Sequence, residues 1–160
     1  MSLERAKTYL AGYGRDGDVL EFDVSSATVE LAAQAVDCAP ERIAKTLSFS
    51  VGDRVALVVC AGDARIANPK FKEYFGCKAK MLSADEAEKR IGHAVGGVCP
   101  FGVKESCDVY FDESLRRFDT VYPACGSSNS AIALTPDELM QIVPEGVWVD
   151  VCKLPVEERS

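Results

Sequence analysis

The chain has 160 residues, 48% of them hydrophobic, with 18 basic side chains against 25 acidic ones. This length suits one sizeable core and is short for two ordinary domains, so we expect a single domain over residues 1–160. The formal net charge of −7 argues against a general binder of duplex DNA or of anionic membranes, because both need an electropositive face.

The cysteines form no familiar metal or disulfide pattern. They number seven and none is spaced as C-x-x-C, so a zinc ribbon and a fully paired disulfide framework are both disfavoured. Reduced thiols in a cytoplasmic protein are the simpler interpretation. No apolar signal core follows Met1, and no apolar run approaches the ~20 residues of a membrane span. We therefore expect a cytoplasmic protein without a metal or cofactor.

The hydrophobic pattern predicts short helices and strands along the whole chain. Leu3, Ala6 and Leu10 repeat at helical spacing, Gly52 lies between two β-rich runs, and residues 83–86 form a capping box. In chain order we predict a helix at 2–13, a half-buried strand at 19–24, a helix at 28–36, strands at 43–51 and 54–61, helices at 69–75 and 83–91, strands at 107–111, 120–122 and 130–134, and a helix from 135 to 142.

Hairpin strands alternate with short helices, without a regular βαβ pattern. This arrangement favours an α+β fold with a mostly antiparallel sheet. No internal repeat, low-complexity segment or linker precedes the charged tail at 157–160.

Lys45 is the first residue whose position is unusual. The strand period places it with Ile43, Leu47 and Phe49 on one apolar face. A lysine aimed at a core or cleft must find a partner or line a cavity, because an unpaired buried charge is costly. It is either a functional side chain or a lysine that protects an edge strand and extends to the rim.

Two glycine-rich or polar stretches are the other candidates. Residues 92–102 hold four glycines and one proline, and amides in such a loop can bind a phosphate or a developing oxyanion. The alternative is an ordinary tight connection, since neither a P-loop nor a G-x-G-x-x-G pattern is present. Residues 126–130 could bind a polar edge of a substrate or form a simple polar turn.

Several catalytic classes are disfavoured. With a single histidine, His93, and no G-x-S-x-G motif, a Ser-His-Asp hydrolase and a histidine metal site lack their residues. Cys99 could act as a nucleophile with His93 nearby, but a buried, inert cysteine is the stronger expectation.

Taken in order, these segments resemble the YbaK/ProX-type aminoacyl-tRNA deacylase family, the free-standing relatives of the editing domain of bacterial prolyl-tRNA synthetases. The resemblance covers residues 3–145. It rests on Lys45-Thr46-Leu47, on the run from Gly96 to Gly102, on Gly126 to Ser130 followed by residues 131–139, and on Thr28-Val29-Glu30.

The resemblance implies a curved, mostly antiparallel mixed sheet with flanking helices and a central pocket. It also implies trans-editing, the hydrolysis of the ester that joins a wrong amino acid to the terminal adenosine of tRNA. Cysteine, alanine or a similar small amino acid on tRNA-Pro is the expected substrate. The implied partners are the acceptor end of aminoacyl-tRNA and a synthetase such as prolyl-tRNA synthetase. A non-catalytic module that binds tRNA ends or a synthetase is the alternative.

By the same resemblance, Lys45 is the essential lysine, and the backbone near Gly97 and Cys99 stabilises the oxyanion. An aspartate of cysteine-specific members is absent where Ser130 aligns, and Cys99 replaces a hydroxyl residue of many relatives, so the amino-acid specificity stays open. The implied substrate-binding residues are Thr28, Val29, Thr46, Gly96, Val98, Pro100, Phe101, Gly102, Gly126, Ser127, Ser128 and Ser130.

Overall fold

The structure is a computed structural model that describes residues 2–94 and 96–155, so the charged tail at 157–160 lies outside the described residues. None of the described helices is long and apolar enough to cross a membrane. The helices are α1 (Ser2–Ala11), α2 (Val29–Val36), α3 (Asn68–Phe75), α4 (Ala84–Ile91) and α5 (Pro136–Ile142). The strands are β1 (Leu20–Glu21), β2 (Ile43–Val51), β3 (Arg54–Ala61), β4 (Arg65–Ile66), β5 (Cys107–Asp112), β6 (Tyr122–Pro123), β7 (Ser130–Ala131), β8 (Val147–Val149) and β9 (Cys152–Lys153).

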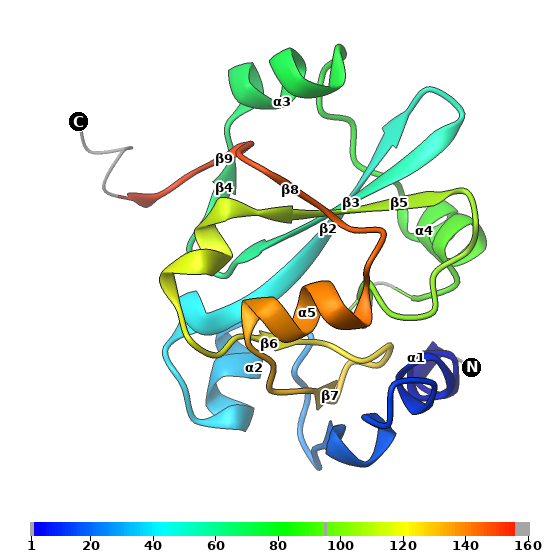
Figure 1. Cartoon of the computed structure of the whole chain (residues 1–160), viewed down its shortest axis with the longest axis vertical. Coiled ribbons are helices and arrows are strands. Elements are labelled where there is room, and N and C mark those ends of the chain that lie inside the picture. Colours follow the sequence, from blue (N-terminus) through cyan, green and yellow to red (C-terminus); the bar gives the residue numbers. More distant parts are fainter. Residues whose placement is uncertain (1, 95, 156–160) are drawn as a thin grey trace.

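A five-stranded sheet in the order β6-β2-β3-β5-β8 forms the centre of the molecule. Its longest ladder joins β2 and β3 in antiparallel register, with Lys45 opposite Cys60. Residues 55–61 of β3 are buried on both faces, as a continuous apolar run predicts for a central strand. Figure 1 shows α3 at one end of the long axis and α1 and α2 at the other.

The α+β class and the curved mixed sheet with flanking helices are confirmed, but the expected dominance of antiparallel pairing needs correction. Three of the four neighbouring pairs in the central sheet are parallel, namely β2–β6, β3–β5 and β5–β8. Parallel neighbours need long crossover connections, and here these connections contain α3, α4 and α5. Only the tight turn at Gly52, which adopts a positive φ of 61°, makes a hairpin within this sheet.

The predicted helices are confirmed, and three of them begin at a side chain that caps the helix. Thr28 accepts a hydrogen bond from the Leu31 amide at the start of α2. Capping boxes begin α4 at Ser83 and α5 at Thr135. These signals are local, so the sequence carries them without help from the rest of the fold.

The half-buried strand predicted at 19–24 is wrong over most of its length. Only Leu20–Glu21 is a strand, paired with β7, and the side chains of Leu20 and Val24 are 42% and 60% exposed. Alternation shows that a segment suits a sheet surface, but not that a partner strand lies beside it. The short strands β4, β8 and β9 were not predicted.

Candidate functional site

A cavity of about 480 Å³ lies along the outer edge of β2. On this edge β6 pairs only with Ile43 and Ala44. Farther along, residues 80–82 follow the strand, where the Ser50 amide donates to the Lys80 carbonyl at 2.9 Å. Residues 45–47 stand in the interval between these two neighbours. The cavity is lined by Ser26, Ala27, Thr28, Val29, Ala32, Ile43, Ala44, Lys45, Thr46, Leu47, Ser48, Met81, Leu82, Ala84, Gly96, Val98, Tyr122, Ala124, Ser130 and Ala131.

The interruption leaves the main chain of Thr46 on an open strand edge. Ser48 and Ser50 direct their backbone groups to residues 80–82, and alternation therefore directs the amide and carbonyl of Thr46 to the same edge. Within ranges 2–94 and 96–155, no strand pairs with Thr46 on that edge. Its amide and carbonyl are thus available to a ligand in the cavity.

Two hydroxyl groups at the cavity lack partners. The Oγ1 atom of Thr46 and the Oγ atom of Ser26 are buried and accept or donate no hydrogen bond among the described residues. A buried hydroxyl without a partner costs free energy, on the order of 1–3 kcal/mol. Retaining two of them around one cavity is what a site for a polar ligand requires.

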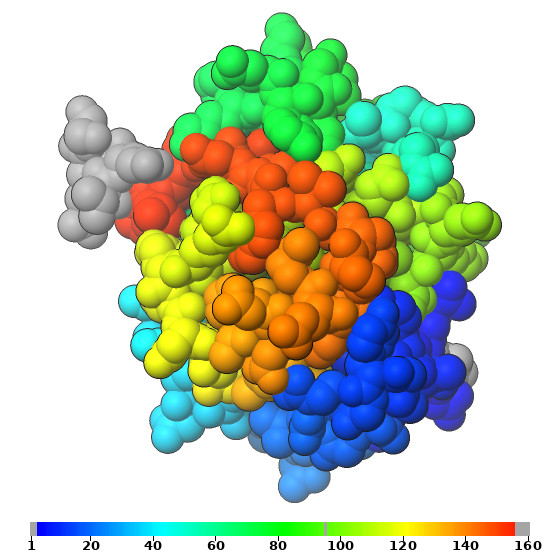
Figure 2. Space-filling view, in the orientation of Figure 1, coloured from blue at the N-terminus to red at the C-terminus, as the bar shows by residue number. Residues whose placement is uncertain are grey.

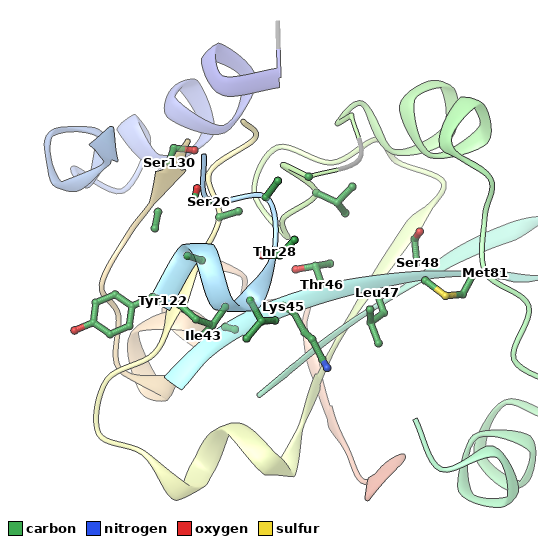
Figure 3. A pocket seen from close by; sticks show the side chains of 18 of the residues that line it. Ser26, Thr28, Ile43, Lys45, Thr46, Leu47, Ser48, Met81, Tyr122 and Ser130 are labelled. Atoms are coloured by element: carbon green, nitrogen blue, oxygen red, sulfur yellow. The ribbon is translucent and has the colours of Figure 1, made fainter. Parts of the chain in front are cut away.

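Lys45 lines the same cavity but leaves β2 on a different side from Thr46. Figure 3 shows Lys45 and Leu47 pointing to one side of the strand, and Thr46 and Ser48 pointing to the other. The predicted alternation of this strand is therefore confirmed. Lys45 is half-buried, and its Nζ atom donates to the Gly62 carbonyl at 3.3 Å. No other acceptor among the described residues engages the ammonium, so two of its N–H groups can bind a ligand.

Gly62 fixes the surroundings of this lysine. A Cβ atom at Gly62 would collide with the Pro40 carbonyl oxygen and would lie 2.8 Å from Cγ1 of Val29. Glycine therefore lets the start of α2, capped by Thr28, pack directly beside the carbonyl that holds Lys45. In this way the structure brings the predicted residues Thr28, Val29 and Lys45 together at one cavity.

The glycine-rich loop contributes two cavity residues, Gly96 and Val98. Gly97 lies behind them, where an added Cβ atom would come within 2.5 Å of the Ser127 amide nitrogen. Its own N–H already donates to the Ala94 carbonyl at 3.0 Å. The amide predicted to bind an oxyanion is therefore engaged within the loop, and Gly97 provides close packing instead.

The rest of this loop turns into the core, because Cys99, Pro100 and Phe101 are buried and do not line the cavity. Gly102, also outside the cavity, packs against Arg5 of α1. The Cys99 Sγ atom lies 3.6 Å from Nε2 of His93, and that ring nitrogen is 2.7 Å from the Phe101 carbonyl oxygen.

The buried Cys99–His93 contact does not activate the thiol. Burial raises the pKa of the Cys99 thiol to about 12, and burial lowers the pKa of His93. The thiol stays protonated and the imidazole neutral near pH 7, and both side chains are fully buried. This contact therefore suits core packing and does not suit a thiolate nucleophile.

The turn at 126–130 supplies one cavity residue and anchors others. Ser130 lines the cavity, whereas Gly126, Ser127 and Ser128 do not. The Ser128 carbonyl accepts from the Ser26 amide at 2.6 Å, and Oγ of Ser127 lies 2.7 Å from Oγ of Ser130. This turn thus holds the cavity wall that carries Ser26, Ala27 and Thr28.

Sequence reasoning missed more than half of the cavity lining. Alternation along β2 places Ser48 on the same side of the strand as Thr46, so Ser48 could have been predicted as a lining residue. Met81, 59% exposed, and Tyr122 reach the cavity only because their segments join the edge of β2, which no local pattern reveals. The lining residues that the prediction omitted are Ser26, Ala27, Ala32, Ile43, Ala44, Leu47, Ser48, Met81, Leu82, Ala84, Tyr122, Ala124 and Ala131.

Comparison with known proteins identifies the family of this chain. The family model described as "Aminoacyl-tRNA editing domain" matches residues 23–142. The chain therefore belongs to the aminoacyl-tRNA editing domain family, as the resemblance predicted.

Some relatives match this chain over almost their whole length, and others match it over a small part of theirs. The chain is 53% identical over 154 residues to the uncharacterized protein YwhH of Bacillus subtilis (strain 168), covering 96% of this chain and 98% of that protein. It is 29% identical over 102 residues to a proline–tRNA ligase of Geobacillus sp. (strain WCH70), covering 63% of this chain and only 18% of the ligase. A solved structure of a candidate trans-editing enzyme for prolyl tRNA synthetase superposes with a TM-score of 0.85 at 28% identity, over 95% of this chain and 97% of that one.

Proposed function

We propose that this protein is a trans-acting aminoacyl-tRNA deacylase, which hydrolyses the ester bond of a mischarged tRNA in the cytoplasm. The observation that carries the proposal is the interrupted edge of β2. There, a half-buried lysine with two uncommitted N–H groups and an unpaired main-chain edge meet at one cavity. Membership of the editing-domain family and the fold shared with a candidate trans-editing enzyme support the same reaction.

In this mechanism the side chain of Lys45 acts from one face of β2, and the main chain of Thr46 acts from the open edge of the strand. The ammonium of Lys45, held by the Gly62 carbonyl, binds the terminal phosphate or the ester carbonyl, or orients the attacking water. The Thr46 amide is the donor we assign to the developing oxyanion, since the Gly97 N–H is already bonded. One such donor contributes about 3–4 kcal/mol to transition-state stabilisation, and an aminoacyl ester is labile enough to need little more. Gly97 and Cys99 then act by shaping the loop that forms the facing wall.

The cavity walls favour a small amino acid. Val29, Ala32 and Val98 narrow the space, while Ser26 and Thr46 present the two hydroxyls that lack partners. Size alone separates similar side chains by about 1–3 kcal/mol, but a buried polar group left unpaired separates them further. We therefore expect serine or cysteine to be removed faster than alanine, with tRNA-Pro as the expected carrier.

A panel of mischarged tRNAs tests this function directly. The protein should release a small amino acid from tRNA at a rate well above spontaneous hydrolysis and should leave correctly charged prolyl-tRNA intact. The same panel tests specificity, because seryl, cysteinyl and alanyl esters can be compared on one tRNA. Hydrolysis of none of them, by folded protein at high concentration, would overturn the proposal.

A binding module is the second candidate, and one observation favours it. No aspartate, glutamate or histidine lines the cavity among the described residues, so no side chain there serves as an ordinary general base. A module of this kind would bind tRNA ends or a synthetase such as prolyl-tRNA synthetase without turnover. Tight binding of tRNA together with an unchanged ester half-life would identify it.

A further inference from the structure

A second feature of the molecule is a concentration of positive charge around α3. Residues 64–82 hold five basic side chains and one acidic one, so this segment carries +4 while the rest of the chain carries −11. In Figure 2 the α3 segment stands out as a lobe at the end of the molecule, beside the β2–β3 hairpin. Such a sign reversal on an acidic protein marks a place where an anion is attracted.

Three lysines of this segment are not neutralised. Elsewhere several arginines are held by carboxylates, as in Arg15–Glu138 and Arg42–Asp119, each at 2.8 Å. Lys72, Lys78 and Lys80 are exposed, and none of them forms an ion pair within the part of the chain that the structure describes. Their charges are therefore available to an external partner.

Two of these lysines rim a hollow. Its volume is about 510 Å³, and its lining is Asn68, Pro69, Lys72, Lys78 and Ala79. Among the described residues no carboxylate contributes to this lining, so its charged members are two lysines. A hollow of this kind admits single phosphate groups, whereas a flat basic patch would suit the surface of an anionic membrane.

The hollow and the cavity at β2 are lined by neighbouring residues of one segment. Residues 78 and 79 line the hollow and residues 81 and 82 line the cavity, so one short segment connects them. Met81 bridges to Phe49, four residues along β2 from Lys45, or roughly 13 Å at the usual strand rise. Phe49 in turn packs on Phe71 of α3 at 4.8 Å between ring centroids. Because strand side chains alternate, Lys45 shares with Phe49 the side of β2 that α3 covers.

We propose that the hollow lined by Lys72 and Lys78 is a phosphate-binding site for RNA, and that it holds the backbone of the acceptor arm while the charged end occupies the cavity at β2. This inference rests on the proposed function. Contacts to phosphates fix register and orientation without reading sequence, which is the task of a site next to a reaction centre. Two or three lysines correspond to a shallow salt dependence, since the slope changes by about 0.7–0.9 for each phosphate contacted.

The test replaces both lysines of the hollow and compares substrates of two lengths. The variant Lys72→Gln/Lys78→Gln should raise KM for full-length aminoacyl-tRNA about 5- to 20-fold, with kcat within twofold of the unmodified protein. The salt slope should become shallower by about 1.4–1.8. Hydrolysis of an aminoacylated adenosine, which has no backbone phosphate for the hollow to bind, should not change.

Two further variants control for charge and for folding. Lys89→Gln/Lys104→Gln removes the same number of charges from two exposed lysines, one in α4 and one that follows it, and should leave KM within twofold. Lys72→Arg/Lys78→Arg keeps the charge and should keep most of the affinity. An equal loss in the α4 control, or an equal loss on the aminoacylated adenosine, would overturn the phosphate site.

Direct binding separates this inference from the proposed function. The full chain is titrated with an uncharged tRNA transcript, and in parallel with vesicles rich in phosphatidylserine. If the protein hydrolyses no ester but binds the transcript, and the double variant loses that salt-sensitive binding, the phosphate site stands while the deacylase function fails. Binding to vesicles and not to the transcript contradicts the site. Equal binding of the transcript by the unmodified protein and by the double variant also contradicts it.

Discussion

The edge of β2 and the loop around Cys99 both contain residue types that can take part in catalysis. They differ in accessibility, because the first borders a cavity and the second is buried. At β2, Lys45 has a single carbonyl partner, and Thr46 presents unpaired groups to a cavity. In the loop, Cys99 and His93 contact each other at 3.6 Å but are sealed in the core. The difference lies in solvation and access, and it agrees with the expectation from the sequence that Cys99 is a buried, inert cysteine.

The comparison shows why a contact between a thiol and an imidazole is not enough for catalysis. A nucleophilic cysteine needs a thiolate, and desolvation moves the pKa of Cys99 in the wrong direction. A lysine can function beside a cavity because its long apolar stem packs while its ammonium reaches a polar partner. We therefore expect the largest loss of activity from a substitution at Lys45 and the smallest effect at His93.

Replacing Lys45 should cause the greatest loss of activity. We expect Lys45→Ala to lower kcat/KM for deacylation at least 100-fold, because among the described residues its ammonium is the one cation on the cavity lining. The free energy of unfolding should change by less than about 1 kcal/mol, since a partly desolvated charge is removed. Urea unfolding monitors the fold, and Lys89→Ala serves as the control on an exposed helix. Full activity in folded Lys45→Ala protein would disprove the role of this lysine.

Replacing Thr46 by valine should separate activity from stability. The side chain keeps its shape, so removal of an unpaired buried hydroxyl should raise the free energy of unfolding by about 1 kcal/mol. Deacylation of a polar aminoacyl group should fall about 10-fold at the same time. Parallel urea titrations and steady-state kinetics give both quantities. A loss of stability would mean that the hydroxyl has a partner in the folded protein.

Changing Cys99 should affect stability more than activity. Cys99→Ala leaves a small space in the core and should cost about 1–2 kcal/mol of unfolding free energy, with kcat changed less than threefold. Cys99→Ser should also keep substantial activity. The half-buried thiols of Cys38 and Cys77 should react with a thiol reagent before Cys99 does. A kcat that collapses in folded Cys99→Ser protein would restore a thiol mechanism.

His93 should give a small pH effect on stability. Burial lowers its pKa in the folded state, so just below pH 6.5 the unfolded chain binds a proton that the folded protein does not. The free energy of unfolding should therefore decrease as the pH falls below about 6.5. Carboxylates whose pKa is lowered, such as Glu86 and Glu138, contribute only nearer pH 4. The chain has one histidine, so stability curves of the protein and of His93→Gln isolate the effect. Equal slopes between pH 5 and 6.5 would contradict it.

Much of the fold was predictable because its signals are local. Capping residues fixed the starts of α2, α4 and α5, and the turn at Gly52 fixed the β2–β3 hairpin. The parallel neighbours of the sheet could not be derived in this way, because they join residues far apart in the chain. The isolated strand pattern at 19–24 failed for the same reason, since its partner β7 supplies only two residues.

The sequence by itself indicated the helices, the β2–β3 hairpin and the family, and it drew attention to Lys45, which the structure places on the cavity lining. Only the tertiary structure decided which of the candidate functional segments is accessible. In the folded chain the pairing of β6 with β2 ends at Ala44, and residues 80–82 join the same edge of β2 from Ser48 onward. The cavity lies beside residues 45–47, between these two neighbours. The fold also turns Cys99 into the core and gathers Lys72 and Lys78 around one hollow. Accessibility and local dielectric depend on the packing of the whole chain, whereas caps, turns and periodicity depend on a few neighbouring residues.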